Sequence, residues 1–296
     1  MPALRALADA FPAHRRALAG PAALGPLARL ADPELEVVDA QGLAPLPEAL
    51  AGADVAVNLH GRGPQSHAVL LATGPRRLIA FAHPDHPGAG QAGWRADEHE
   101  VKRWCRLLRE SGVPADAARL DLPAPPWAAP AAARGATLIH PGAASGARRW
   151  PAERWVQVAR AERAAGRRVV LTGSRGERRL AAEIAVGAGL GSDAVLAGRT
   201  DVTALAAAVA AADRVACGDT GVSHLATAFG VPSVTLFGPT PPALWGPPPD
   251  RPRHVALWAG EAGDPHADRP DAGLLALRPA DVISALEQLP AARFAA

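Results

Sequence analysis

The chain has 296 residues, enough for two ordinary domains or one large one. Its 31 Lys and Arg residues nearly balance 29 Asp and Glu residues, for a formal net charge of +2, and opposite charges alternate along the chain. A basic stripe interleaved with aromatic residues does not occur, which argues against a nucleic-acid-binding protein. The hydrophobic fraction of 49% supports a sizeable core, so we expect a soluble globular protein.

Cysteine usage and hydropathy bear on cellular location. Cys105 and Cys217 are the two cysteines and lie far apart, which argues against a disulfide framework and favours a reducing cytoplasm. No segment approaches roughly 18 uninterrupted apolar residues, so we expect no membrane span, and the first ten residues lack the apolar stretch of a signal peptide. We therefore predict a cytoplasmic protein; the sequence leaves peripheral contact with a membrane surface open.

Predicted helices and short apolar strands are mixed in the first part of the chain. Helical patterns span Ala3–Phe11 and Glu98–Arg109. Short apolar runs predict strands at Leu35–Val38, Asp54–Leu59 and Leu78–Phe81. Polar residues follow the second of these strands, Asp54–Leu59, in the loop that connects it to the next element.

A proline- and alanine-rich segment separates two predicted domains. Leu122–Gly135 reads LPAPPWAAPAAARG, and its prolines break helices and disfavour central strands. We predict domains at residues 1–125 and 136–278, joined by a linker at 126–135. A final helix within 279–296 is expected to pack back across the domain boundary.

The second part of the chain alternates apolar strands and helices more regularly. The predicted strands are Thr137–Ile139, Arg168–Leu171, Ala194–Leu196, Arg214–Ala216 and Ser233–Phe237. The predicted helices are Ala152–Ala165, Glu177–Val186, Asp201–Ala211 and Val222–Phe229. This alternation predicts parallel βαβ units, and hence an α/β protein with a doubly wound parallel sheet. Such sheets bind ligands beyond the carboxyl ends of their strands.

The loop after the first of these strands reads HPGAASGARRWP and carries two arginines. Pro151 occupies a favoured position in the first turn of the next helix, and small residues allow a close approach of the backbone to a ligand. Arg148 and Arg149 supply positive charge where a diphosphate would lie. An ordinary glycine-rich turn with solvent-exposed arginines remains an alternative.

A second polar loop, GDTGVSH, opens an apolar helix. Asp219 or Thr220 is placed to cap this helix, whose first-turn amides attract an anion. Helical periodicity places His224 on the same side as Thr220 and Gly221. The alternative is a structural cap with a hydrogen-bonded histidine.

Two further loops contribute supporting residues. Glu177, in TGSRGE, either caps a helix or accepts hydrogen bonds from a ribose. Thr200 and Asp201 are most simply interpreted as N-cap residues.

Several familiar motifs are absent from the sequence or from the position that would give them meaning. No GxGxxG directly follows a predicted strand, no GxxxxGK[ST] is present and no GxSxG elbow occurs, which argues against a nicotinamide dehydrogenase, a P-loop enzyme and a hydrolase of the elbow type. We predict no metal site, because the candidate side chains lie in proline-broken loops without a closed ligand set. These candidates are His83, His86, Asp264, His266, Asp268 and Asp271.

Four segments resemble glycosyltransferase family nine, the heptosyltransferases that transfer sugars from nucleotide-heptose donors onto lipopolysaccharide core acceptors. They are HPGAASGARRWPAERW (140–155), LTGSRGERRLA (171–181), LAGRTD (196–201) and CGDTGVSHLATAFGVPSVTLFGPT (217–240). The resemblance implies a GT-B architecture of two Rossmann-like domains facing a cleft. The first domain would hold the acceptor and the second the nucleotide-sugar, with inversion at the anomeric carbon, no metal and no cofactor besides the nucleotide-sugar substrate.

The resemblance also implies roles for individual residues. Arg148 falls where the family usually has a lysine that faces the donor diphosphate, and it would stabilise the leaving group. Glu177 matches a residue that contacts the ribose, and Thr200 lies where the chain approaches the base. The implied donor-binding residues are Ala144, Ser145, Arg148, Glu177, Thr200, Asp219, Thr220, Gly221 and His224.

One departure from the family pattern concerns the general base. In the family an N-terminal strand and a Gly-Asp loop, whose Asp is the base, precede a helix resembling the one that follows Met1. We therefore expect an incomplete N-terminal domain and no general base in this chain, with a start assigned too late or a truncated enzyme as the explanations. The candidate acceptor-side residues are His60, Arg62, Gln65 and His67, for which a polar surface loop is an equal alternative.

Two hypotheses of different classes result. The first is an inverting, metal-independent glycosyltransferase that moves a sugar, heptose by family default, from a nucleoside-diphosphate-sugar to a hydroxyl of a glycan or glycolipid. Contact with the inner membrane surface would accompany such an acceptor. The second is a catalytically impaired nucleotide-sugar-binding protein that lacks the base.

Overall fold

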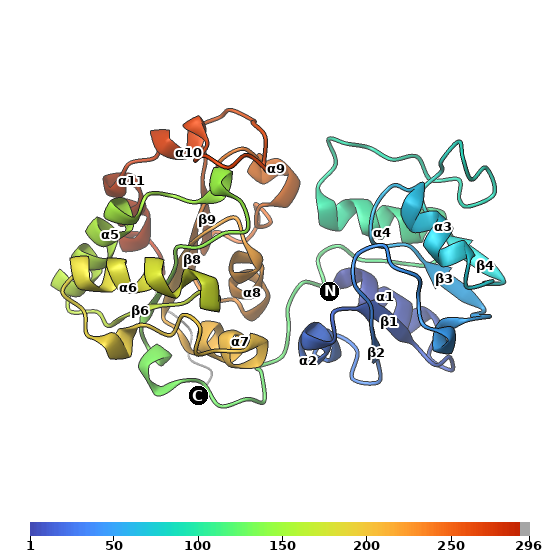
Figure 1. Ribbon diagram of the computed structural model, residues 1–296, viewed down its shortest axis with the longest axis horizontal. Helices are drawn as coiled ribbons and strands as arrows, with labels where there is room; N and C mark the ends of the chain where they lie inside the picture. The colour runs from blue at the N-terminus through green and yellow to red at the C-terminus, as the bar shows by residue number, and fades with distance from the viewer. Residues whose placement is uncertain (291–296) are drawn as a thin grey trace. The chain divides into compact units, whose positions relative to one another are not determined.

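The chain divides into two compact units, and the division falls between Leu120 and Asp121 (Figure 1). The computed structural model describes residues 1–290. The predicted boundary near residue 125 is therefore slightly too late. The predicted linker at 126–135 is also wrong in part, because Ala133 is buried in the core of the second unit. Alanines that make a segment resemble a linker here serve as small core residues.

The first unit contains four short strands and four α-helices. The helices are α1 (Pro2–Ala10), α2 (Gly25–Arg29), α3 (Gln65–Leu71) and α4 (Glu100–Glu110). The strands are β1 (Ala17–Gly20), β2 (Glu36–Asp39), β3 (Val55–Val57) and β4 (Arg77–Ile79). They form two separate parallel pairs, β1 with β2 and β3 with β4. Among the described residues, the first unit thus shows parallel pairing but not the single continuous sheet of a Rossmann-like domain.

The core of the first unit lies between helices α1 and α4 and strand β4. Ala3 and Ala6 of α1 pack with Ile79, Phe81 and the α4 residue Leu107 in one buried cluster. Burial of large side chains such as Ile79, Phe81 and Leu107 is the main stabilising contribution in a small domain, at roughly 1.5–3 kcal/mol each.

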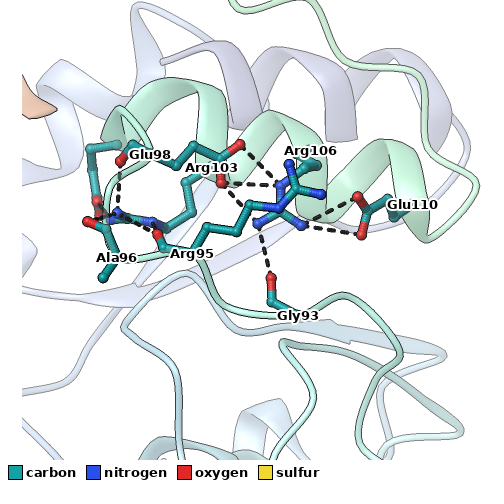
Figure 2. A network of polar contacts seen from close by, with 8 residues as sticks. Gly93, Arg95, Ala96, Glu98, Arg103, Arg106 and Glu110 are labelled. Carbon is teal, nitrogen blue, oxygen red and sulfur yellow. Dashed lines mark hydrogen bonds and ion pairs between the residues drawn. The ribbon is translucent and has the colours of Figure 1, made fainter. Parts of the chain in front are cut away.

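Two buried arginines of α4 hold the segment before the helix in place (Figure 2). Arg106 donates to both carboxylate oxygens of Glu98, at 3.0 Å from Nε and 2.8 Å from Nη2, and to the Gly93 carbonyl at 2.9 Å. Arg103 donates to the Glu98 carbonyl at 2.7 Å, and its guanidinium lies 4.2 Å from the ring centre of Trp94. The hydrogen bonds from Arg106 lower the pKa of Glu98. The backbone carbonyls of this irregular segment are thereby satisfied without a strand partner.

The second unit is a doubly wound α/β domain. Its strands are β5 (Thr137–His140), β6 (Val169–Leu171), β7 (Arg214–Gly218), β8 (Ser233–Leu236) and β9 (His254–Leu257). Its helices are α5 (Ala152–Ala164), α6 (Arg178–Gly187), α7 (Val202–Ala211), α8 (Gly221–Phe229), α9 (Pro242–Trp245), α10 (Ala272–Ala276) and α11 (Pro279–Glu287). The strands form one five-stranded parallel sheet in the order β6-β5-β7-β8-β9. The expectation of a doubly wound parallel sheet is confirmed here.

Side chains alternate between the two faces of this sheet. Ile139 packs on one face with Trp155 of α5 and Ile184 of α6, whereas its neighbour Leu138 packs on the other face with Val209 of α7. The same alternation continues along β7. Strands buried on both faces explain why the sequence shows continuous apolar runs in this half of the chain, and Figure 1 shows the helices flanking the strands.

The C-terminal helix belongs to the second unit. Val282 and Leu286 of α11 are buried in the same cluster as Trp155 of α5. The expectation that the 279–296 segment packs back across the domain boundary stays a prediction, and residues 291–296 lie outside the described residues. The apolar face of α11 is covered by its own domain.

Six elements were not expected from the sequence, and one expected strand is shorter. The unexpected elements are strands β1 and β9 and helices α2, α3, α9 and α10, which lack strong periodicity over enough residues to be recognised. The predicted strand 194–196 is reduced to an isolated bridge between Leu171 and Val195, next to a 3₁₀ turn at Ser192–Ala194. That bridge nevertheless places the loop after Val195, which carries Thr200, beside the outer edge of β6.

Acid should destabilise the second unit through His254. Burial, with Arg251 and Arg253 nearby, lowers the pKa of His254 to about 4, so protons bind preferentially to the unfolded chain as the pH falls below about 6.5. Stability from this group is complete above that pH and is lost as the pH falls towards 4, by up to about 3 kcal/mol. Denaturant unfolding at several pH values should show a flatter acid dependence for His254→Asn. An identical acid dependence in both proteins would contradict this.

Candidate functional site

The site is positioned by the strand order of the second unit. The chain passes from β5 to β6 on one side of the sheet and then to β7 on the other side of β5. The connection after β5 leads to α5 on one face, and the connection after β7 leads to α8 on the opposite face. Neighbouring loops that diverge in this way open a crevice at the carboxyl ends of the strands, where doubly wound proteins bind ligands.

Arg148 bridges the two diverging loops. It ends a 3₁₀ turn at Gly146–Arg148, and its Nη1 donates to the backbone carbonyl of Asp219 at 3.3 Å. Its Nε donates to Oγ of Ser145 at 3.3 Å, and that hydroxyl donates in turn to the Pro265 carbonyl at 2.6 Å. Ser145 therefore positions Arg148. Ala144 lies exposed beside it.

The glycines of the loop after β5 are needed for packing within the chain. A Cβ on Gly146 would lie 1.7 Å from the Asp268 carbonyl oxygen, and one on Gly142 would lie 2.0 Å from Oε1 of Glu177. The expectation that small residues make room for a ligand is thus wrong at these two positions. Their space is taken by the chain itself, which anchors the loop against the segment 264–271 and against Glu177.

Helix α8 begins without a side-chain cap. Thr220 is its N-cap residue, yet the Thr220 side chain makes no capping hydrogen bond to the first-turn amides. The Oγ1 atom of Thr220 is buried and has no hydrogen-bond partner among the described residues. Helix α7, by contrast, is capped by Asp201, whose Oδ1 accepts from the Ala204 amide at 2.8 Å. An uncapped helix start carries a partial positive charge and suits an anion.

Asp219 lies between strand β7 and this helix start. Its side chain is buried, and its amide donates to the Leu236 carbonyl at 3.1 Å. Burial raises the pKa of the Asp219 carboxyl, and the nearby Arg148 guanidinium only partly opposes the rise. The site thus holds a carboxyl group whose charged form is disfavoured, next to a cation and a helix N-terminus.

A second polar group lies at the ends of β5 and β6. His140 Nδ1 is 2.9 Å from Oγ1 of Thr172, and Glu177 forms a capping box with Ser174, accepting from its amide at 2.7 Å. Burial lowers the pKa of His140, and the nearby Glu177 carboxylate opposes this by raising the pKa to a smaller extent. The sequence interpretation missed Thr172, although a threonine that directly follows a buried strand is the signal that would have identified it.

The remaining predicted donor-side residues extend the site in both directions. Thr200, partly exposed, directly precedes the capped start of α7. His224, exposed on the first turn of α8, has its ring centre 6.1 Å from that of Trp245 in α9. Gly221 is exposed at the helix start.

In the first unit the predicted acceptor-side residues separate into two groups. His60 and Arg62 are exposed on the segment between β3 and α3, and Gln65 is exposed at the first position of α3. His67 is fully buried, with Nε2 2.7 Å from the Phe81 carbonyl and Nδ1 3.2 Å from Nδ2 of Asn58. The prediction of direct acceptor contact by His67 is therefore wrong, because its ring holds the loop from inside.

Within residues 1–290, no group of three or more His, Cys, Asp or Glu side chains is arranged to hold a metal ion. Over the same residues, none of the helices has both the length and the apolar character to cross a membrane. Cys105 and Cys217 are buried free thiols in different units.

These features define a class: an α/β protein of parallel sheets, whose second unit brings a guanidinium, a buried carboxyl group and a helix start together at the switch point of a doubly wound fold. Residues 92–272 match the sequence profile of glycosyltransferase family 9 (heptosyltransferase). Because this match covers more than half of the chain, the protein belongs to glycosyltransferase family 9.

A curated relative and two solved structures are similar to the chain. A stretch of 98 residues is 40% identical to lipopolysaccharide heptosyltransferase 1 of Pseudomonas aeruginosa, and it covers 33% of this chain but only 27% of that protein. The ADP-heptose lps heptosyltransferase II of E. coli aligns with a TM-score of 0.72 at 20% identity, over 96% of this chain and 92% of that one. E. coli heptosyltransferase WaaC, solved with ADP, aligns with a TM-score of 0.70 at 18% identity, over 97% and 94%. The likeness shows that the fold is GT-B.

Replacing the Asp219 carboxyl by an amide should stabilise the fold at neutral pH. Because burial raises its pKa, the ionised carboxylate penalises the folded state, and the penalty appears as the pH rises through the folded-state pKa. We expect the unfolding free energy of Asp219→Asn to exceed that of the parent by little at about pH 4 and by most at about pH 7. Denaturant titrations of both proteins measure this gap, and a gap that narrows as the pH rises would show that Arg148 outweighs burial.

Proposed function

We propose that the protein is a glycosyltransferase that moves a sugar from a nucleoside-diphosphate-sugar to a hydroxyl of a glycan or glycolipid, with inversion at the anomeric carbon. Heptose is the sugar, ADP the nucleotide and lipopolysaccharide core the acceptor class that its relatives suggest. The observation that carries the proposal is the contact between Arg148 and the Asp219 carbonyl, because it places a guanidinium beside the uncapped start of α8. A diphosphate is the part of a nucleotide-sugar that such a pair of groups recognises.

The strand order supports one orientation of the donor. From the outer edge inwards, the loops that follow the strands carry Thr200, then Glu177 after β6, then Arg148 after β5 and Thr220 after β7. A donor with its base near Thr200 and its ribose near Glu177 reaches Arg148 and Thr220 with its diphosphate. The sugar then lies further along the same edge, towards β8.

The residues of this chain act mainly on the leaving group. As the acceptor oxygen bonds to the anomeric carbon, the bond from that carbon to the diphosphate oxygen breaks, and the acceptor proton is released to water. The sequence predicts no general base in this chain, so we assign none of its residues to take that proton. Negative charge grows on the departing diphosphate. Arg148 and the first-turn amides of α8 are placed to meet that charge in fixed positions, which is the arrangement that lowers a barrier most. The side chain of His224 adds a further polar group on the same helix turn.

The proposal assigns acceptor contacts to the first unit. Three exposed side chains contribute an imidazole (His60), a guanidinium (Arg62) and an amide (Gln65). These groups suit the hydroxyl and phosphate groups of a charged glycan. Asn58 and the buried His67 support the segment around His60 from within, since Asn58 also accepts from the His60 amide at 2.9 Å through its Oδ1.

Loss of the Arg148 guanidinium should slow transfer by about 10²-fold, because one fixed partner of the leaving diphosphate is removed. Arg148→Lys should recover only part of the rate, since a lysine offers a point charge in place of a planar fork. Product nucleotide release from ADP-heptose with lipopolysaccharide core acceptor measures turnover, and calorimetry measures ADP affinity.

The matched control is Arg160→Ala, which removes an equally charged side chain that is exposed on α5 and donates to the Gly187 carbonyl at 2.8 Å, and which should leave both values unchanged. If Arg148→Ala behaves like this control, the diphosphate assignment fails. Donor binding without any transfer would favour the nucleotide-sugar-binding alternative.

Chelation should leave the transfer rate unchanged. In the proposed mechanism Arg148 and the helix amides supply the charge compensation that a divalent cation supplies in metal-dependent transferases. Turnover after exhaustive EDTA treatment and dialysis, compared with turnover after adding back magnesium or manganese, tests this. A rate that collapses with EDTA and returns with metal would overturn the metal-independent mechanism.

A further inference from the structure

Trp245 is a large aromatic residue exposed at the ligand edge of the second unit. Its relative exposure is 41%, whereas Trp150, Trp155 and Phe237 of the same unit are 3% exposed or less. An exposed indole gives up the stabilisation that burial of its large apolar surface would provide. The core does not account for Trp245, so its position requires another explanation.

The backbone around Trp245 is fixed before any ligand arrives. Pro241 and Pro242 open the short helix α9, and the Gly246 amide donates to the Pro242 carbonyl at 2.6 Å. A Cβ on Gly246 would lie 2.5 Å from that carbonyl oxygen, so the turn depends on glycine there. Proline-restricted torsions on one side and a tight turn on the other limit the freedom of the indole. A preorganised side chain loses little entropy when it binds.

The position of Trp245 follows from the strand order. Helix α9 comes after β8, which lies next to β7 on the side away from β5. The Trp245 ring centre is 6.1 Å from that of His224 on the first turn of α8, with the ring planes tilted by 45°. A donor whose base and ribose lie towards β6, and whose diphosphate lies at β5 and β7, therefore directs its remaining substituent, the sugar, towards Trp245.

We propose that Trp245 is the sugar-contacting residue of the donor site, with its indole face stacked against the C–H face of the transferred sugar and His224 beside it. The inference rests on the proposed function. It adds a specificity-determining contact for the sugar that is separate from the diphosphate contacts of Arg148. A large flat indole favours a pyranose with an accessible apolar face, and the polar imidazole serves the hydroxyl groups at its rim.

The test compares binding of ADP-heptose with binding of ADP by calorimetry. Aromatic stacking contributes about 0.5–1.5 kcal/mol, so Trp245→Ala should weaken ADP-heptose binding by about 2- to 10-fold and leave ADP binding unchanged. Trp245→Phe should retain most of the affinity because it keeps an aromatic face. Val186→Ala, which shortens a side chain that is 78% exposed on α6, is the control and should change neither affinity.

A second readout does not depend on the alanine variant being folded. Intrinsic fluorescence of the parent should change on adding ADP-heptose by more than on adding ADP, and this extra change should disappear in Trp245→Phe. If ADP binds but Trp245→Ala affects both ligands equally or neither, or if the extra change persists in Trp245→Phe, the sugar contact is refuted while the donor site stands. If neither ligand binds the parent protein, the proposed function itself fails.

Discussion

The contact between the Arg148 guanidinium and the Asp219 carbonyl, 3.3 Å long, depends on the topology of the second unit and in turn defines its site. It joins the loops after β5 and β7, which lead to helices on opposite faces of the sheet. A different strand order would separate these loops by a strand or more. The cation, the buried carboxyl group and the uncapped start of α8 would then not share one location.

The site combines several locally unfavourable features within a rigid frame. Asp219 is a carboxyl group whose pKa is raised by burial, and Thr220 has a buried hydroxyl without a partner among the described residues. Unsatisfied buried polar groups cost about 1–3 kcal/mol each. The frame that tolerates them is the two-faced hydrophobic core of the sheet, together with the close packing of Gly142 and Gly146 against neighbouring segments. Locally unfavourable features of this kind are concentrated at the binding and catalytic sites of proteins.

The family assignment and the electrostatics of the site carry different information. Family membership comes from the match over residues 92–272, and solved relatives at 18–20% identity establish the GT-B fold. The charge arrangement belongs to this chain and depends on the Arg148 guanidinium. A planar guanidinium is able to bind the Asp219 carbonyl and a phosphate oxygen together, because it offers several donors in a fixed geometry.

The sequence by itself determined the parallel α/β class, the regular strands β5, β7 and β8, and the two loops that carry Arg148 and Thr220, because apolar periodicity and loop composition are local properties. Tertiary structure decided which side chains are buried and which become neighbours, because local sequence patterns do not specify either. His67 turned inwards because its ring pairs with Asn58 and Phe81, and the alanines near Ala133 became core because the sheet covers them. Helix α11 joined its own domain for the same reason. The neighbours of a side chain are set by strand order and packing, which connect residues far apart in the chain.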